Sequence, residues 1–290
     1  MLGEVELVID AKATLGEGPS WDSKRHLLYW VDILGQKLHL YNPTTGINKS
    51  IALGQLVGSV VPRKSGGVVL ALEKGFYFLD LETKSLQAIF DPESHLEENR
   101  FNDGKCDPKG RFWAGTTDSV GTNEAGALYC LGKDLLTKKK LGKVSTSNGL
   151  AWSPDHKYMY FIDTPTRKVV QFEYDLNSGH IENPIDVIYF VDDEGLPDGM
   201  TIDDEGMLWI AHWGGSKISR WNPKSGKQML SVPIPAFYVT SCTFGGKDLN
   251  ELYITTARME NNHSKIFPIA GGVFRIKTSV KGCPTYQFNN

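Results

Sequence analysis

The sequence predicts an all-β fold, specifically a six-bladed β-propeller. Three observations favour it: short β-rich runs, polar turns between them, and an internal repeat. The runs include HLLYWVD, RFWAGTT, YMYFIDT and MLWIAHW, and the turns include NPTTG, DPKG, SPDHK and NPKSG. Helical periodicity is nearly absent. Many short strands at regular spacing are typical of a closed or repeating β architecture.

The repeat has four clear copies and two weaker ones, roughly 40–50 residues apart. The clear copies open with GEGPSWD, NDGKCDPKG, SNGLAWSPD and PDGMTIDDEG, and the weaker ones with GSVVPRKSGG and TSCTFGGKD. Each copy contains several strands, so it forms a small antiparallel sheet that cannot bury both faces alone. Radial packing against like neighbours solves this problem. Six copies use up the chain, and we expect residues 1–290 to form one domain.

The individual elements follow in chain order within each copy. An inner strand comes first, then a polar turn, a second strand, a loop and a third strand that ends in another polar turn. In the first copy these strands are GEGPSWD, HLLYWVD and KLHLYN. The leading segment EVELVID is a spare strand outside the copies. We expect it to complete the last blade and so tie the two ends of the chain together.

Composition narrows the range of partners. The chain is 40% hydrophobic and 22% charged with a net charge of -3, which gives no reason to expect nucleic acid or an acidic membrane surface. The N-terminus lacks the pattern of a signal peptide. The four cysteines are far apart and form no Cys-x-x-Cys pair, which favours reduced thiols in a cytoplasmic protein. The expected partner is a small molecule, and the expected state is a monomer or weak dimer.

Oxygen-bearing side chains recur immediately before a glycine of the clear repeats. They are Glu17, Asp103 with its neighbour Asn102, Asn148 and Asp198. Asp-Gly, Asn-Gly and Glu-Gly are also ordinary turn sequences, and any single copy is explained that way. Four in register favour a shared site, because equivalent positions on inner strands of a propeller point into the same central channel.

Carboxylates crowded into one channel repel each other. A divalent cation would relieve this repulsion, and Glu, Asp and Asn oxygens are suitable ligands for a hard ion. The pattern therefore predicts one divalent metal ion. The residue types leave Ca²⁺, Zn²⁺, Mn²⁺ and Mg²⁺ open.

Several long motifs resemble one protein family. LGEGPSWD (15–22), NRFNDGKCDPKGRFWAGT (99–116), SNGLAWSPD (147–155) and PDGMTIDDEGMLWIA (197–211) are similar to the family of regucalcin (senescence marker protein 30), gluconolactonase and luciferin-regenerating enzyme. The match runs through essentially the whole chain. It implies a six-bladed propeller, one divalent metal in the channel, and hydrolysis of sugar lactones or related esters.

The resemblance also implies roles for individual residues. Glu17, Asn148 and Asp198 correspond to metal ligands, and Asp198 is also the proton donor and acceptor. Arg100 and Asn102 correspond to substrate-holding positions. The repeat pattern alone points to Asp103 where the resemblance points to Asn102. Because neighbouring strand residues alternate in direction, we expect Asn102 to face the channel and Asp103 to support the site from behind.

One position departs from the family. Sugar lactonases of this kind carry a glutamate shortly after the AGT of the third repeat, and Val120 falls about there; Asp118 and Glu124 are nearby. This affects the substrate more than the reaction type. The leading hypothesis is a metal-dependent lactonase similar to gluconolactonase. The alternatives are hydrolysis of organophosphates or aryl esters in the same site, a calcium-binding regulatory protein, and a non-catalytic propeller that binds protein partners.

Overall fold

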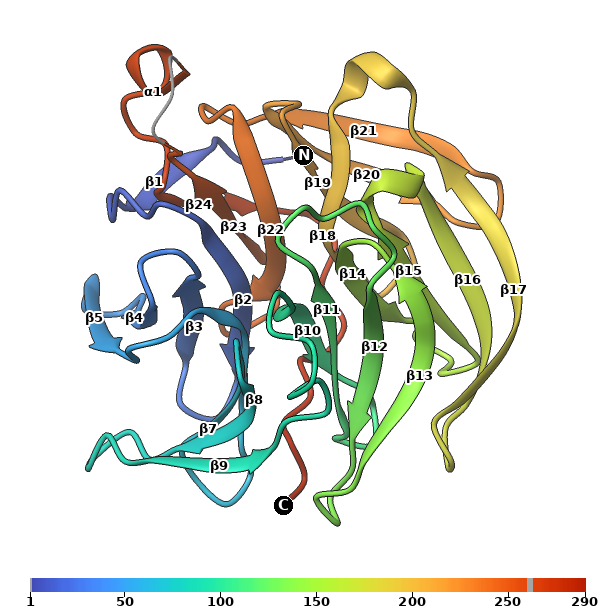
Figure 1. The fold of residues 1–290 in the computed structure, drawn as a ribbon. Helices are drawn as coiled ribbons and strands as arrows, with labels where there is room; N and C mark the ends of the chain where they lie inside the picture. Colours follow the sequence, from blue (N-terminus) through green and yellow to red (C-terminus); the bar gives the residue numbers. More distant parts are fainter. Residues whose placement is uncertain (1, 260–262) are drawn as a thin grey trace.

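The computed structural model describes residues 2–259 and 263–290. Its architecture is almost entirely β, in five hydrogen-bonded sheets arranged around a centre (Figure 1). Four of the sheets have four strands each in chain order. They are β2 (Gly16–Asp22), β3 (Leu27–Asp32), β4 (Lys37–Asn42) and β5 (Ile47–Ala52); β6 (Val57–Pro62), β7 (Val68–Leu72), β8 (Gly75–Leu79) and β9 (Leu86–Phe90); β10 (Arg100–Cys106), β11 (Phe112–Thr117), β12 (Gly126–Leu131) and β13 (Thr137–Val144); and β14 (Ser147–Trp152), β15 (Tyr158–Asp163), β16 (Lys168–Asp175) and β17 (His180–Tyr189).

The fifth sheet has eight strands in the order β1-β24-β23-β22-β19-β20-β21, with β18 paired to β19. Its strands are β1 (Glu6–Ile9), β18 (Leu196–Ile202), β19 (Leu208–Trp213), β20 (Lys217–Asn222), β21 (Lys227–Pro233), β22 (Tyr238–Gly245), β23 (Glu251–Ala257) and β24 (Val273–Lys277). One register pair, Trp213 with Tyr238, joins β19 to β22. The sheet therefore consists of two four-stranded runs linked at a single point.

The N-terminal strand joins the last strand of the chain, as the sequence predicted. β1 runs antiparallel to β24, with Glu6 opposite Arg275. Their side chains form an ion pair of 2.6 Å. The first and the last strand of the chain therefore lie in one sheet.

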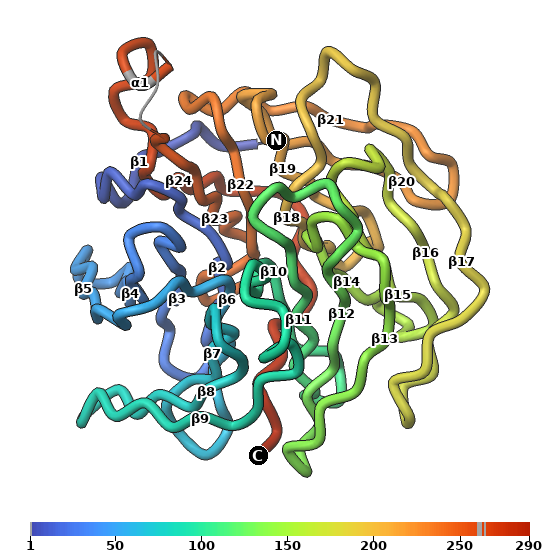
Figure 2. The backbone as a smooth tube through the Cα atoms, in the orientation of Figure 1, coloured from blue at the N-terminus to red at the C-terminus, as the bar shows by residue number. Residues whose placement is uncertain are grey.

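The innermost strands form a ring. β2, β6, β10, β14, β18 and β22 each pack against the next one, and β22 packs against β2. Figures 1 and 2 show these strands around the centre of the molecule. Apolar clusters fill the spaces between successive sheets; Trp21, for example, stacks on Tyr253 with ring centroids 5.8 Å apart. An all-β fold similar to a propeller is therefore what the sequence builds.

Every inner strand contains the same irregularity. The register against the second strand shifts partway along, between Glu17 and Ser20 in β2 and between Phe101 and Gly104 in β10. The same shift occurs in β6, β14, β18 and β22. Such bulges re-aim side chains where they occur. Here they sit at the oxygen-bearing positions that the sequence singled out.

The strand register corrects the alignment of the third repeat. Beyond the bulge, Asp22 pairs with Leu27, the first residue of β3. The amides of Asp107 and Asp203 likewise donate to the carbonyls of Arg111 and Met207, each of which immediately precedes the second strand of its sheet. Counting back five residues places Asn102, not Asp103, level with Glu17 and Asp198. The alignment of the repeats on their glycines was therefore shifted by one residue in the third repeat. Asp103-Gly104 has the same sequence pattern as Asp198-Gly199, but Asp103 lies at the level of Gly199.

The C-terminal segment crosses the ring at the far ends of the inner strands. Its backbone bonds to Ile202 through Cys283, to Pro62 through Phe288, and to Gly110 through Asn289. Phe288 is completely buried. In Figure 2 this red segment passes behind the inner strands toward the C-terminus. It links sheets that are far apart in the sequence.

Helix is confined to short turns in the described residues. They are η1 (Thr164–Thr166), η2 (Asp192–Glu194) and α1 (His263–Ile266). None of the helices described is long and apolar enough to span a bilayer. All four cysteines are unpaired.

Candidate functional site

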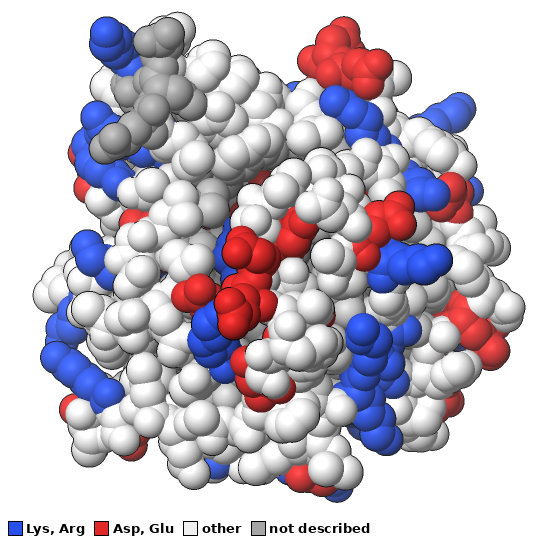
Figure 3. Space-filling view, viewed as in Figure 1, with Lys and Arg blue, Asp and Glu red and all other residues white. Residues whose placement is uncertain are grey.

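The candidate site lies on the axis of the ring, at the bulges. We call one residue on each inner strand its axis position: Glu17, Gly58, Asn102, Asn148, Asp198 and Thr240. Close approaches between neighbouring strands support the common level, since the Thr240 hydroxyl donates to the Gly16 carbonyl and the Asn102 amide to Asn148. In Figure 3 acidic and basic side chains adjoin near the centre of this face of the molecule.

Glu17 is a buried carboxylate with one local hydrogen bond. It is 5% exposed, and its Oε2 accepts the amide hydrogen of Gly18 at 2.9 Å. Gly18 has φ = +52°, a left-handed conformation that glycine adopts without steric cost. Burial and then the nearby Asp103 carboxylate raise the pKa of Glu17 to about 8, against the opposing effect of Arg100. In the absence of a cation Glu17 would therefore take up a proton near neutral pH.

Asp198 lies in the same environment. It is 4% exposed. Burial raises the pKa of Asp198 well above its ordinary value, and the charges of Glu17 and Asp103 raise it further, while the Gly199 amide works against them. Three carboxyl groups thus act on one another in a space from which water is largely excluded.

Asn148 presents a fixed amide. The Thr164 hydroxyl donates to the Pro197 carbonyl at 2.8 Å, so its oxygen is left to accept from Nδ2 of Asn148, also at 2.8 Å. This sets the orientation of the amide and leaves its Oδ1 on the other side, where Nδ2 of Asn102 approaches to 3.1 Å. Asn148 therefore offers an oxygen, the ligand atom that a hard cation prefers.

Asn102 and Arg100 form a second fixed group. Nδ2 of Asn102 also donates to the Ser147 carbonyl at 2.9 Å, and its Oδ1 accepts from Nη1 of Arg100 at 2.8 Å. Nη1 of Arg100 makes a further bond to the Phe101 carbonyl at 3.0 Å. Both hydrogen bonds use the same nitrogen. The rest of the guanidinium remains available to a bound molecule.

Asp103 has one carboxylate oxygen bound within its own turn and, in the described part of the chain, one oxygen without a partner. Its Oδ1 accepts from the Gly104 amide at 2.7 Å, but Oδ2 is buried and has no hydrogen-bond partner among the described residues. Burial raises the pKa of Asp103, and the Lys105 ammonium opposes this effect. Lys105, which the sequence reasoning missed, donates to the Met200 carbonyl at 2.6 Å. An Asp-Gly-Lys sequence carries no signal that its lysine will be half-buried inside the ring.

The donor chemistry fits a divalent cation. Glu17 and Asp198 supply carboxylate oxygens and Asn148 an oriented amide oxygen, and the unpartnered Oδ2 of Asp103 adds negative charge nearby. An uncompensated buried charge of this kind is costly unless something pairs with it. Across residues 2–259 and 263–290, no three His, Cys, Asp or Glu side chains form an ion-holding cluster. The expected ligand set contains only two carboxylates, since its third member is an amide.

The loop after β11 carries the position where the family has a glutamate. Val120 is 65% exposed. Asp118 accepts hydrogen bonds from Gly121 and Asn123 of its own loop. The hydroxyl of Thr146, which immediately precedes β14, donates to the Gly121 carbonyl at 2.8 Å and holds the loop against the start of that strand. Asp118 is therefore occupied with the loop itself.

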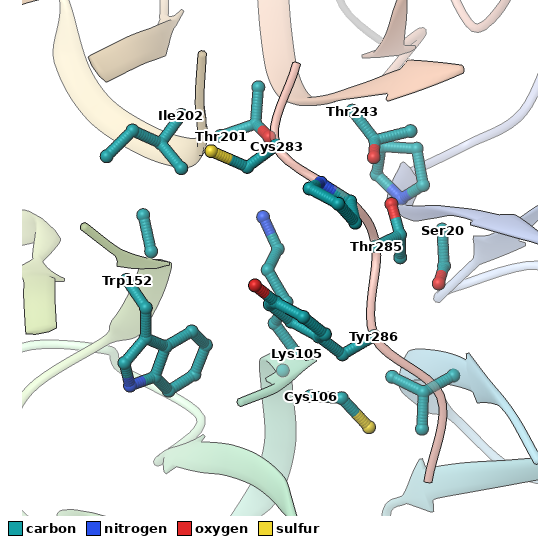
Figure 4. A pocket seen from close by; sticks show the side chains of 15 residues that line it. Ser20, Lys105, Cys106, Trp152, Thr201, Ile202, Thr243, Cys283, Thr285 and Tyr286 are labelled. Atoms are coloured by element: carbon teal, nitrogen blue, oxygen red, sulfur yellow. The ribbon is translucent and has the colours of Figure 1, made fainter. Parts of the chain in front are cut away.

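A separate cavity of about 40 Å³ lies at the other end of the same axis. Figure 4 shows Lys105 reaching into it between Trp152 and the C-terminal segment, with Cys283 and Tyr286 on the opposite wall. This space is large enough for only a few water molecules and is too small for a sugar lactone. It does not include the axis carboxylates. We therefore place the candidate site at the bulges and not in this cavity.

Comparison with known proteins identifies the family of this chain. The model of the SMP-30/Gluconolactonase/LRE-like region matches residues 15–258. The chain belongs to this family. It is 44% identical to the "Putative sugar lactone lactonase" of Bacillus subtilis (strain 168), with 97% of each chain covered. It is 40% identical to regucalcin of Oryctolagus cuniculus, with 98% of each covered.

Solved structures show the same fold. A luciferin-regenerating enzyme superposes with a TM-score of 0.93 at 34% identity, covering 99% of this chain and 100% of the other. A calcium-binding protein, regucalcin, from Agrobacterium tumefaciens superposes with a TM-score of 0.94 at 26% identity, covering 99% and 98%. The resemblance that the motifs indicated is thus confirmed. This member of the family carries Glu17, Asn148 and Asp198 at matching levels of three inner strands.

Proposed function

We propose that this protein is a metal-dependent lactonase that opens a sugar lactone or a related cyclic ester. The observation that carries the proposal is the mutual effect of the buried carboxyl groups of Glu17, Asp103 and Asp198, at the level of the ring where Asn148 presents an oriented amide oxygen. Family membership and the similarity to a sugar lactone lactonase support the same reaction. The proposal includes a six-bladed propeller, with the eight-stranded sheet counted as two blades.

Glu17, Asn148 and Asp198 would hold the ion. A divalent cation, when bound, supplies a Lewis acid that polarises a carbonyl and lowers the pKa of water. In the proposed reaction Asp198 accepts the proton of the attacking water and returns it to the leaving alkoxide. Arg100 and Asn102 orient the lactone, and the guanidinium stabilises negative charge on the carbonyl oxygen. Proton transfer by a positioned carboxylate typically contributes about 10²–10⁴-fold to the rate.

The test is acid release from glucono-δ-lactone and from aryl esters. The protein is stripped with a chelator and reloaded separately with Ca²⁺, Zn²⁺, Mn²⁺ or Mg²⁺, which also determines the preferred ion. We expect turnover that depends on the ion in the wild type. Glu17→Gln and Asn148→Ala should lower both turnover and the bound metal found by elemental analysis, with an unchanged far-ultraviolet circular dichroism spectrum.

Asp134→Ala is the matched control, because Asp134 is an exposed residue of the turn between β12 and β13 and is not one of the axis positions. Metal content that is the same in wild type, Glu17→Gln and Asn148→Ala would refute the ligand assignment.

A calcium-binding regulatory protein is the second candidate. It is favoured by the similarity to regucalcins, one of which is described as a calcium-binding protein. Tight Ca²⁺ binding without turnover of any lactone or ester would support it over the lactonase. Hydrolysis of aryl esters in preference to lactones would instead support the esterase alternative.

A further inference from the structure

We infer that the channel mouth selects lactones that carry an apolar substituent on the carbon next to the lactone ring oxygen. Leu196 and Tyr238 form the main part of the wall that makes this selection. This deepens the proposed lactonase function and rests on it. The wall consists of the residues two places before each axis position, which we call the mouth positions. They are Leu15, Leu56, Arg100, Thr146, Leu196 and Tyr238.

The mouth positions surround the entrance to the axis. In β10 the mouth and axis side chains face the same way, because Nη1 of Arg100 donates to Oδ1 of Asn102. We infer the same orientation at the equivalent places of the other repeats, where the mouth residue is the first residue of the inner strand or immediately precedes it. All six mouth residues are half-buried, whereas Glu17, Asn148 and Asp198 are each at most 5% exposed. The side chains at this level therefore mark the place where the channel meets solvent.

The apolar residues occupy one continuous sector. The inner strands follow one another around the ring as β18, β22, β2 and β6, so Leu196, Tyr238, Leu15 and Leu56 are consecutive. Arg100 and Thr146, on β10 and β14, complete the circle with polar groups. Leu15 and Leu56 also contact the core between the first two sheets, which anchors their side of the wall.

Aromatic rings extend the apolar sector beyond Tyr238. Trp213 lies opposite Leu196 in the β18–β19 register, and its ring is 4.2 Å from that of Tyr238. Phe237 packs edge-on against Tyr238 at 4.8 Å. On the polar side, the loop that Thr146 holds through Gly121 carries the exposed Val120. Apolar side chains thus reach the rim on this side too.

This arrangement should give lactones different affinities according to the polarity of their substituent. The lactone carbonyl has polar partners toward Arg100 and Asn102, but a polyhydroxylated substituent directed at the leucines of the apolar sector would lose water without gaining hydrogen bonds. An alkyl or aryl substituent would instead be stabilised by leaving water. Burial of one methylene changes affinity roughly threefold to fourfold.

The test uses δ-lactones substituted at the carbon next to the ring oxygen, from methyl to pentyl, together with glucono-δ-lactone. In metal-loaded wild type we expect kcat/KM to rise roughly threefold to fourfold per methylene. Leu196→Gln should flatten this dependence. Leu136→Gln is the matched control, since Leu136 is 60% exposed on the β12–β13 turn and should preserve the slope.

A binding measurement separates this inference from the proposed function. The matching 6-alkyl δ-lactams are not hydrolysed under these conditions, so their Kd can be followed by calorimetry whether or not turnover occurs. Tighter binding with longer chains in wild type, and its loss in Leu196→Gln or Leu56→Gln, supports the wall. No dependence of either kcat/KM or Kd on chain length in wild type overturns it, even if glucono-δ-lactone is hydrolysed rapidly. Chain-length-dependent lactam binding without lactone turnover supports the wall but counts against the lactonase.

Discussion

Buried acids occur at two levels of the repeats, the axis positions and the positions five residues further along the chain, and their environments are opposite. At the axis level, Glu17 and Asp198 accept few hydrogen bonds and face other carboxylates. At what we call the turn level, Asp22, Asp107 and Asp203 are each completely buried and fully partnered. Asp107, for example, accepts bonds from two backbone amides, Arg111, the Trp113 indole and the Tyr174 hydroxyl.

The difference distinguishes acids that hold the fold from acids kept for a ligand. A buried carboxylate surrounded by donors stabilises the turn that it closes. A buried carboxylate that faces other carboxylates is destabilising by itself and persists where a cation compensates it. The comparison makes separable predictions for stability and activity.

The largest expected effect is on activity at the axis level. Asp198→Asn should lower kcat/KM for the best lactone by about 10²–10⁴-fold, because the residue loses its capacity to accept a proton. The thermal unfolding midpoint of the metal-free variant should stay the same or rise, since one repelling charge is removed. An Asp198→Asn protein with full activity would exclude Asp198 as the general base.

The next effect is on stability at the turn level. Asp107→Ala leaves Arg111, Trp113 and Tyr174 without their shared acceptor, and we expect a loss of about 3–5 kcal/mol in unfolding free energy. Urea denaturation at constant temperature measures this, and the exposed Asp134→Ala should stay within about 0.5 kcal/mol of wild type. Activity per folded molecule should be retained. An Asp107→Ala protein as stable as Asp134→Ala would show that partnering does not distinguish the two levels.

A smaller effect concerns the pH dependence of the metal-free protein. The pKa of Glu17 is raised to about 8 in the fold, so the folded state binds more protons than the unfolded state between the ordinary value of 4.5 and about 8. Its contribution to stability is therefore lost as pH rises through that window. Unfolding midpoints in chelator from pH 5 to pH 8.5 should fall with pH, and less steeply in Glu17→Gln. Equal slopes for the two proteins would contradict the raised pKa.

The smallest effect concerns the C-terminal segment. Nε2 of Gln287 donates to Oδ1 of Asp22 at 3.2 Å, one of several bonds to that carboxylate. Gln287→Ala should cost about 1 kcal/mol or less, because the backbone donors of Lys24 and Arg25 remain. A loss of unfolding free energy as large as that of Asp107→Ala would mean that the C-terminal segment, and not the turns, stabilises the turn-level acids.

Much of the fold was accessible from the sequence. The turn-level acids stand in DSKR, DPKG and DDEG, where an aspartate followed by turn residues predicts the side-chain to backbone bonds that the structure shows. The spare N-terminal strand was predicted from the count of repeats. Both inferences depend on local chemistry, which a sequence displays directly.

The remainder depends on register and on contacts between repeats. Asp103-Gly104 looks like Asp198-Gly199, and only the strand pairing places Asn102 at the axis position. The partial burial of Lys105 and the apolar sector at the mouth arise because neighbouring strands meet around an axis. From the sequence alone, a leucine such as Leu196 is predicted to be an ordinary core residue. Its place at the channel mouth follows only from its level on the ring of inner strands.

The pairing of β1 with β24 also bears on how the chain is made. Glu6 and Arg275, which form an ion pair, are separated by 269 positions. On the ribosome the first strand therefore emerges long before its partner exists, while each four-stranded sheet from β2 to β17 can form from residues already synthesised. Closure of the ring is consequently a late step of biosynthesis, and until then the nascent chain must keep an unpaired strand edge from associating with other chains.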